Sequence, residues 1–516
     1  MVPQKKTAHI VQNSFFLICL FIYSTILLVF VCSNHLSTFG NDSINYLVMG
    51  LYMSPWQEVN KAIIEMWPYQ EYPPLYPAIL AITGIVHDLQ FAHAITAIFF
   101  VVSLVLFYFY LRQQKLECWP AFFIVSIFAL SPGAWMNNMG ILSETLYLLI
   151  SFLFLLTLDQ LKLPSKKYLI YLGILLGCLI LTRTIGIAML LAFSLIGLVF
   201  FLKKQQNLKT IATPIVIAIV ISLLSKLFLK TTVPDDYIDQ FSKLPGYDFT
   251  TQYQAIIDGW FTSWQYYWLE DAHVAFYIAC ALGILTIAGL LRRLFELKPD
   301  AVYIIIYLTV IMIWPHPGQT FRFLFPVMPL LLFFAYDFIS YLANNYANKR
   351  RELVLILSVL IVINMIFPTL VFTYYRYQSG VDTGLNKYKE YYLLPDLAEA
   401  RQKVMQQQMM FEDFKRIKLT TNQDSVIAYF EPEYVTYLAE RRSEFIRFYE
   451  TEAGEVKLHK PDKSDYVLLT SLHPRKTREQ INGLYTYQYF KEFTDIEWIS
   501  KSDNETKVSY FLKVLN

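Results

Sequence analysis

Long apolar runs alternate with short polar loops over the first 375 residues, and this pattern predicts a bundle of membrane-spanning helices. A run of roughly 20 apolar residues is long enough to cross the hydrocarbon core of a bilayer. With shorter runs accepted beside loops, we expect about eleven spans. They lie near Ser14–Val31, Ala94–Leu111, Trp119–Trp135, Ile141–Leu158, Tyr168–Leu181, Ile185–Leu202, Ile211–Leu229, Val274–Leu291, Ala301–Trp314, Phe323–Tyr341 and Leu353–Tyr374.

One further apolar segment, Pro73–Val86, is short and opens with two prolines. We expect a re-entrant or interfacial helix there, because counting it as a span would spoil the charge pattern of the loops. With the N-terminus inside, most Lys and Arg residues of the loops lie on the inner side. The outer loops hold only Lys61, Arg183, Lys230, Lys243 and Arg322. This asymmetry is what the positive-inside rule requires, so the N-terminus is expected in the cytoplasm.

The composition changes after Tyr375, where charged residues become common and no run of span length remains. The segments SVIAYF, SDYVLLTS and VSYFLKVL predict strands, and PEYVTYLAERR and PRKTREQINGLYTY predict helices. We therefore divide the chain into a membrane domain, residues 1–375, and a small α/β domain, residues 376–516. An odd number of spans places the second domain outside the cytoplasm.

Composition and charge exclude several classes of protein. Hydrophobic residues make up 55% of the chain, and the net charge is only +2, so no nucleic-acid partner is expected. The five cysteines lie in or beside apolar segments without a CxxC motif, which indicates small core residues rather than disulfides or a zinc site. His87, Asp88 and His316 form no set of metal ligands with a recognised spacing.

Two carboxylates follow the first predicted span, in an outer loop rich in aromatic residues: Asp42 in GNDSINYLVMGLY and Glu71 in QEYPPLYPAIL. Placing a charged carboxylate at the membrane surface costs little free energy, and such a group can act as a base towards a substrate delivered from the bilayer. Asp42 also suits the N-cap of a helix over the residues that follow it. Glu71 equally suits an ordinary solvated loop, so both alternatives stay open.

Several segments in order carry a resemblance to a known family: Asp42 after the first span, EYPPLYP, SPGAWMNNMGILSETLYLL, LTRTIGIAMLLA and RFLFPVMPLL. Each is weak alone, but their order, spacing and membrane side are together fairly specific. Between roughly Asp42 and Pro329 the chain resembles the GT-C superfamily of integral-membrane glycosyltransferases. The branch in question holds the protein O-mannosyltransferases and the bacterial lipid A aminoarabinose transferases. The resemblance implies a polytopic α-helical fold of GT-C type, a sugar donor on a polyprenyl phosphate, and transfer on the outer face.

The resemblance also implies roles for individual residues. Asp42 corresponds to the acid that deprotonates or orients the acceptor hydroxyl, and Glu71 to an acid that precedes the Pro motif. In the aminoarabinose branch a Lys follows that acid, whereas this chain has Tyr72, which removes a cation that helps to neutralise lipid phosphate. Glu144 corresponds to an acid that pairs with an arginine and shapes the cavity. Asp42 and Glu71 are thus the candidate catalytic residues, and Tyr72 and Glu144 are candidates for the substrate site.

Three cations complete the expected site. Arg183 and Arg322 fall at the outer membrane boundary, where the planar guanidinium matches the oxygens of a phosphate. Snorkelling, or pairing with Glu144, is the simpler alternative for both. Lys226 lies inside an apolar segment, where a charge is costly, so we expect it to face a cavity or to snorkel to the surface. Some GT-C enzymes use a divalent cation and others do not, so no metal is expected to be obligatory and a divalent cation stays open.

We therefore expect a multi-pass protein of the inner or plasma membrane. It would transfer one sugar, with inversion, from a polyprenyl-phosphate carrier to a hydroxyl of an envelope glycan, lipid or protein. A transporter or flippase of a lipid-linked sugar would also need arginines and a lateral cavity, but inverted repeats and broken midplane helices are not evident. A non-catalytic scaffold would keep the fold without needing Asp42.

Overall fold

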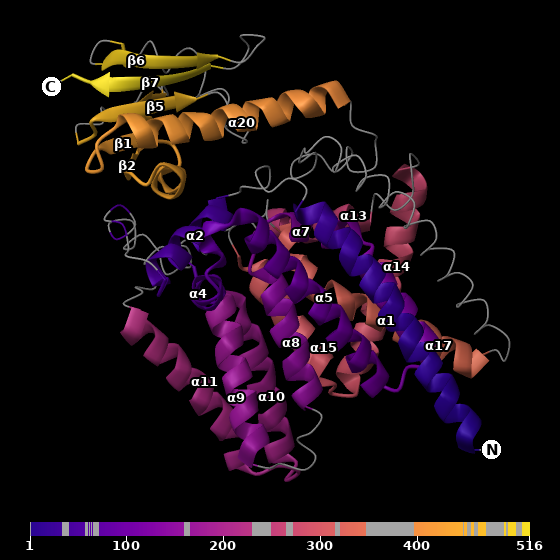
Figure 1. Cartoon of the computed structure of the whole chain (residues 1–516). Coiled ribbons are helices and arrows are strands. Elements are labelled where there is room, and N and C mark those ends of the chain that lie inside the picture. Colours follow the sequence, from indigo (N-terminus) through magenta and orange to yellow (C-terminus); the bar gives the residue numbers. More distant parts are fainter. Residues whose placement is uncertain are drawn as a thin grey trace.

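A computed structural model describes residues 2–32, 41–56, 60, 62, 64, 72–158, 166–229, 249–264, 272–314, 320–346, 397–446, 448–450, 456–458, 463–470, 490–491, 494–501 and 508–515. Its first part is helical and its last part contains a β-sheet, as predicted (Figure 1). The boundary proposed at residues 375/376 and the predicted span Leu353–Tyr374 lie outside the described residues.

The helical part begins with α1 (Val2–Cys32), and the segment predicted as the first outer loop forms α2 (Asn41–Met53), α4 (Leu75–Ile82) and the short η2 (Ile85–His87). The apolar helices that follow are α5 (Leu89–Gln113), α6 (Cys118–Ala129), α8 (Glu144–Leu158), α9 (Lys166–Thr182), α10 (Ile187–Leu202), α11 (Leu208–Leu229), α14 (Ala272–Phe295), α15 (Pro299–Met312) and α17 (Met328–Tyr346).

Five helical segments within the described residues are long and apolar enough to cross a membrane: Asn13–Cys32, Leu89–Gln113, Thr184–Leu202, Leu208–Ser225 and Arg322–Ala343. Shorter apolar helices, Cys118–Ala129, Glu144–Leu158 and Pro299–Met312, stand beside them. Apart from Trp119–Trp135, the predicted spans correspond to apolar helices where the structure describes them, although not every one has the length of a full span. The expected number, about eleven, stays a prediction.

Two details of the helical part differ from the sequence prediction. The run Trp119–Trp135 is not one helix: α6 ends at Ala129, and Ser131 starts α7 (Pro132–Met139) by accepting a hydrogen bond from the Ala134 amide at 3.1 Å. A serine followed by proline is a strong helix-start signal that outweighs the continuous apolar pattern. The segment before α14, where no helix was predicted, also contains one, α13 (Phe249–Trp264).

Small residues allow the helices to approach closely. Gly173 and Gly177, one turn apart on α9, face Ile217 and Ile221 of α11, where a Cβ added to either glycine would come within 2.6 and 3.0 Å of those side chains. Such spacing of small residues is a common way to pack helices in membranes, where lipid removes most of the hydrophobic drive for association.

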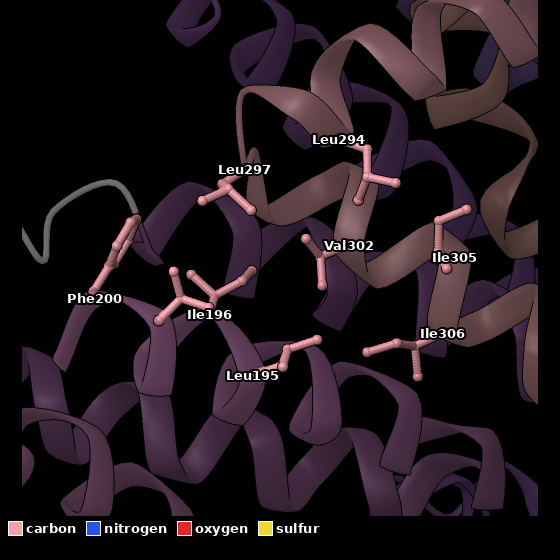
Figure 2. Close-up of a pocket in the computed structure, with 9 residues that line it drawn as sticks. Leu195, Ile196, Phe200, Leu294, Leu297, Val302, Ile305 and Ile306 are labelled. Carbon is pink, nitrogen blue, oxygen red and sulfur yellow. The ribbon is translucent and has the colours of Figure 1, made fainter. Parts of the chain in front are cut away.

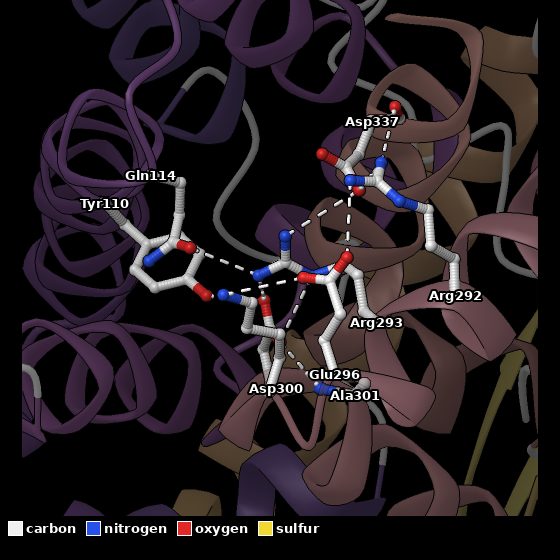
Figure 3. Close-up of polar contacts among 9 residues, drawn as sticks. Tyr110, Gln114, Arg292, Arg293, Glu296, Asp300, Ala301 and Asp337 are labelled. Carbon is white, nitrogen blue, oxygen red and sulfur yellow. Dashed lines mark hydrogen bonds and ion pairs between the residues drawn. The ribbon is translucent and has the colours of Figure 1, made fainter. Parts of the chain in front are cut away.

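A cluster of charged side chains joins the helices at one end of the helical part. At one end, α14 and α15 are joined by a buried ion pair between Arg293 and Asp300 at 2.6 Å (Figure 3). Tyr110 donates to the same Asp300 carboxylate at 2.6 Å, and Arg292 pairs with Asp337 at 3.1 Å. These contacts fix the α14–α15 hairpin against its neighbours.

The C-terminal part is a mixed α/β unit. Helix α20 (Leu397–Thr420) packs on a five-stranded sheet with the order β2-β1-β5-β7-β6. The strands are β1 (Val426–Tyr429), β2 (Arg442–Phe445), β5 (Tyr466–Thr470), β6 (Thr494–Lys501) and β7 (Val508–Val514), with a separate hairpin of β3 (Phe448–Glu450) and β4 (Val456–Leu458). The pairs β1–β2 and β1–β5 are parallel, whereas β7 is antiparallel to both neighbours.

The three predicted strands are β1, β5 and β7, but one predicted helix is shorter than expected. The segment PEYVTYLAERR forms only α21 (Pro432–Tyr434) and a π-helical turn, Val435–Ala439, called η9. Glu440 then adopts a left-handed conformation with φ 52°, which ends the helix, and the chain turns into β2. The second predicted helix, PRKTREQINGLYTY, lies outside the described residues.

The C-terminal part rests on the end of the helical part that carries α2 (Figure 1). The Tyr437 hydroxyl of η9 donates to the Val86 carbonyl at 2.7 Å, and the Asn60 side chain donates to the Glu440 carbonyl at 3.3 Å. The sheet domain therefore covers the first outer segment, next to the carboxylate singled out in the sequence.

Candidate functional site

Four charged side chains from four separate parts of the sequence form one continuous chain of ion pairs. Asp42 of α2 meets Arg322, and Arg322 meets Glu144. Glu144 in turn meets Arg183, with 2.6 Å between its Oε1 and Arg183 Nη1. The sequence predicted all four as site residues, and the structure brings them together.

Asp42 lies in the first turn of α2 and uses both carboxylate oxygens. Oδ1 accepts a hydrogen bond from the Tyr72 hydroxyl at 2.7 Å, and Oδ2 accepts one from Arg322 Nη1. Helix α2 already begins at Asn41, so Asp42 is not the N-cap, and its oxygens point to other segments. About a fifth of the side chain, 19%, remains exposed, so this carboxylate is accessible from outside.

The charge state of Asp42 follows from competing effects. Burial raises the pKa of the Asp42 carboxyl, but the Arg322 guanidinium and the Tyr72 hydroxyl outweigh burial, and the net pKa is lowered below its usual value. Asp42 is therefore firmly ionised while Arg322 is beside it. In this arrangement it is a weak base.

Glu144 is the first residue of α8 and is fully buried. Its Oε1 bridges the two arginines, whereas Oε2 has no hydrogen-bond partner among the residues that the structure describes. The preceding Ser143 joins the same network, because its hydroxyl contacts the Tyr46 hydroxyl at 2.8 Å and accepts from Arg183 at 3.3 Å. Glu144 thus fixes the position of both guanidiniums.

The arginines are placed by breaks in the helices. Arg183 is extended, with φ −152° and ψ 140°, between α9 and the short turn η4 (Thr184–Gly186). Gly186 makes this sharp connection possible, because a Cβ there would lie 2.4 Å from the Leu179 carbonyl. Nε of Arg183 is buried, and within the described part of the chain it has no partner, which leaves donor capacity unused.

Arg322 lies on the five-residue helix α16 (Thr320–Leu324), directly before a proline-induced interruption. Pro326 converts the chain into the 3₁₀ turn η8 (Phe325–Val327) before α17 begins. The Tyr307 hydroxyl donates to the Phe323 carbonyl at 2.7 Å and so satisfies a backbone group in the interrupted stretch. The prolines of the FPVMP segment thus interrupt the helix directly after Arg322.

Three tyrosines form the wall beside Asp42. The Tyr46 ring lies 5.0 Å from both the Tyr72 and the Tyr76 ring, and the Tyr76 hydroxyl contacts Thr96 at 2.7 Å. Sequence reasoning selected Tyr72 but missed Tyr46 and Ser143. Tyr46 follows Asp42 by four residues on α2, so the helical period was the signal that could have found it.

The other residues that the sequence analysis considered lie outside the described residues or away from the ion-paired chain. Glu71 and His316 lie outside the described residues. Lys226 belongs to α11, but the placement of its side chain is outside the described part. Asp88, considered as a metal ligand, caps α5 by accepting from the Gln90 and Phe91 amides at 2.9 and 3.1 Å.

The described residues contain no group of three or more His, Cys, Asp or Glu side chains able to hold a metal ion. The carboxylates of Asp42 and Glu144 face arginines instead.

Comparison with known proteins bears directly on this arrangement. No curated protein sequence matches the chain significantly. A model of the Alg9-like mannosyltransferase family matches residues 261–410. Among solved structures, the oligosaccharyltransferase of Archaeoglobus fulgidus tethered to an acceptor peptide is similar over 97% of this chain and 74% of its own, with 13% identity and a TM-score of 0.50. The chain is thus similar to this mannosyltransferase family over one segment, and to the oligosaccharyltransferase in its fold.

Two further solved structures are similar to this chain. ArnT from Cupriavidus metallidurans bound to undecaprenyl phosphate shares 10% identity over 97% of both chains, with a TM-score of 0.49. The A. fulgidus oligosaccharyltransferase in complex with Zn and sulfate shares 14% identity over 96% of this chain and 73% of that one, with a TM-score of 0.48. At such identities the likeness concerns the fold. The family match includes Arg322 but not Asp42, Glu144 or Arg183, and it extends across the proposed domain boundary.

Proposed function

We propose that this protein is a GT-C glycosyltransferase that moves a single sugar from a polyprenyl-phosphate carrier to a hydroxyl of an envelope glycan, lipid or protein at the outer membrane face. One observation carries the proposal: an accessible carboxylate and two guanidiniums meet in one ion-paired chain. A base and an anion-binding pair are the two functions that this transfer needs.

The arginines would bind the phosphate of the donor. In the transfer, the acceptor oxygen forms a bond to the anomeric carbon, and the bond from that carbon to the phosphate oxygen breaks with its electron pair. Negative charge therefore grows on the phosphate, and the guanidiniums of Arg322 and Arg183 are positioned to offset it. Glu144 would hold both arginines in place without touching the substrate.

Asp42 would accept the proton of the acceptor hydroxyl. In the ligand-free arrangement, two carboxylates balance two guanidiniums, so the donor phosphate must compete with Asp42 for Arg322. We infer that Arg322 turns from Asp42 to the phosphate when the donor binds. Asp42 then loses its cation while it stays partly buried, its pKa rises, and it becomes a stronger base. Donor binding would thus activate the base only when a sugar is available for transfer.

Tyr72 and the less fully described candidates have supporting roles in this proposal. The Tyr72 hydroxyl keeps the Asp42 carboxylate oriented after Arg322 has left, which a lysine at this position would do by charge instead. Glu71 remains a second candidate acid, and Lys226 a further cation for the carrier. The proposed transfer requires no divalent cation.

The proposed orientation puts the N-terminus in the cytoplasm and the sheet domain outside, in an inner or plasma membrane. The site then opens on the outer face, between the first outer segment and the ends of the helices. The C-terminal domain covers α2 from the same side.

Purified protein with a synthetic polyprenyl-phosphate sugar tests the proposal. We expect sugar release that Asp42→Asn lowers by about 10²- to 10⁴-fold, because the amide cannot take the proton. Donor binding should remain. Asp88→Asn is the matched control, since it alters a carboxylate of the same outer segment that only caps α5. Turnover near the wild-type rate in Asp42→Asn would remove Asp42 from the mechanism. Donor binding without any turnover in the wild-type protein would favour a transporter.

A further inference from the structure

An apolar cavity of about 190 Å³ lies between α10 and the α14–α15 hairpin (Figure 2). Its walls include Ile196 and Phe200 of α10, Leu294 and Leu297 of the hairpin, and Val302 and Ile306 of α15. Every labelled side chain is aliphatic or aromatic, so the cavity offers no polar group to hold water.

The cavity is far from the ion-paired chain of the candidate site. Arg183 precedes α10, whereas the cavity is lined by residues of the second half of that helix. Sixteen helical residues separate the two ends of α10, a distance of about 24 Å at 1.5 Å per residue. A ligand here would not be the donor sugar phosphate held by Arg183 and Arg322.

Basic residues follow the lining residues of both walls in the sequence. Ile196, Phe200 and Lys203 follow one another at the spacing of a single helix face, so the apolar wall of α10 runs directly into a lysine. Lys203 and Lys204 are exposed, and neither has a salt-bridge partner among the residues that the structure describes. On the opposite wall, Lys298 directly follows the lining residue Leu297.

The neighbouring arginines are not available to bind a further anion, because each is already paired with a carboxylate. Arg293 is committed to Asp300, and Arg292 to Asp337, in the polar cluster of Figure 3. Lys298 pairs with Glu296 at 3.6 Å. Among the basic residues that adjoin the lining residues in the sequence, Lys203 and Lys204 are therefore the ones without a salt-bridge partner in the described part of the chain. These lysines also suit the C-terminus of α10, where a cation is favoured by the helix dipole. The dipole alone, however, does not explain an apolar cavity beside them.

We propose that this cavity binds one acyl chain of an anionic phospholipid, with Lys203 and Lys204 meeting the phosphate of its headgroup. An apolar slot that ends in unpaired lysines matches the two chemical parts of such a lipid. The acyl chain fills a void that would otherwise leave the facing side chains of α10 and α15 without van der Waals contacts. The lipid thereby fastens α10, the helix that follows Arg183, to the α14–α15 hairpin.

The test is lipid binding by the purified full-length protein in detergent, measured by native mass spectrometry with added phosphatidylglycerol or phosphatidylcholine. We expect phosphatidylglycerol to bind at least about tenfold more tightly, equivalent to about 1.4 kcal/mol. Lys203→Glu combined with Lys204→Glu should abolish this preference. Both lysines are exposed, so the fold should survive the change. Lys209→Glu, another exposed basic position, is the charge-matched control.

A second pair of variants tests the cavity itself. Ile196→Trp fills the space and should displace both lipids, whereas Leu198→Trp, on an exposed face of α10 outside the cavity, should bind as the wild type does. Equal binding of the two lipids by the wild type would overturn the proposal. So would a preference that survives the double lysine variant, or unchanged binding by folded Ile196→Trp.

Discussion

Arg322 is the residue on which the proposed mechanism turns, because it contacts both carboxylates of the ion-paired chain. Its position at the start of a predicted apolar span indicated a cation at the membrane boundary. The sequence did not indicate its partners, since Asp42 and Arg322 are 280 positions apart. Pairing of this kind is decided by the packing of α2, α8 and α16, which no local pattern encodes.

Replacing Arg322 should weaken donor binding in a graded manner. We expect Arg322→Ala to lower the affinity for the polyprenyl-phosphate donor by about ten- to a hundredfold, the value of a charge-assisted hydrogen bond. Arg322→Lys should lose less, because a point charge replaces part of the planar fork. Arg183→Ala should act in the same direction. The measurement is donor binding to purified, correctly folded protein.

Arg292→Ala provides the control for that series. It removes an ion pair with Asp337 at the far end of the helices, so it should leave donor affinity unchanged. Equal affinities for the wild type and Arg322→Ala would refute a phosphate-binding role for this residue.

At the scale of elements, helix breaks rather than helices position the site. Apolar periodicity predicted most of the helices, because long apolar runs have few alternatives in a membrane. It could not predict that Arg183 would lie in an extended gap between α9 and α10, or that α6 and α7 would separate at Ser131. The aromatic pattern before α14 likewise concealed α13.

Gly186 offers a test of this dependence on breaks. A Cβ at Gly186 would meet the Leu179 carbonyl at 2.4 Å, and that atom belongs to the backbone of α9 and cannot turn aside. We expect Gly186→Ala to cost about 1–3 kcal/mol of stability and to weaken donor binding through displacement of Arg183. Thermal unfolding and donor binding measure the two effects. Leu191→Ala, at an exposed position of α10, should change neither. Wild-type donor affinity in Gly186→Ala would show that the tight turn does not position Arg183.

At the scale of the whole molecule, the sequence predicted an α/β domain and three of its strands. Alternating patterns revealed β1, β5 and β7, whose side chains are largely buried, whereas the short β2 and the largely exposed β6 carried too weak a signal. How the domain docks on α2 could not be predicted, because Tyr437 and Val86 are 351 positions apart.

The membrane orientation is open to a direct test. A reporter that is active only in an oxidising outer compartment should be active when fused after Tyr375, since the charge asymmetry of the loops puts the N-terminus inside. The same reporter fused after Lys204, in a predicted inner loop, should be inactive. The reverse pattern would place Asp42 and its arginines on the cytoplasmic side and would end the account of transfer at the outer face.

If donor binding releases Asp42 from Arg322, the acid limbs of kcat and kcat/KM should lie at different pH. The acid limb of kcat/KM for the donor reports the free enzyme, and that of kcat reports the donor complex. In the free enzyme the Asp42 pKa is lowered, so its base form persists as pH falls and kcat/KM should stay level to below about pH 5.

Once Arg322 has turned to the phosphate, the Asp42 pKa rises, so kcat should fall at a higher pH than kcat/KM, by at least about one unit. The residual activity of Asp42→Asn should lack this limb. Acid limbs of kcat and kcat/KM that coincide in the wild-type protein would show that donor binding does not release Asp42 from Arg322.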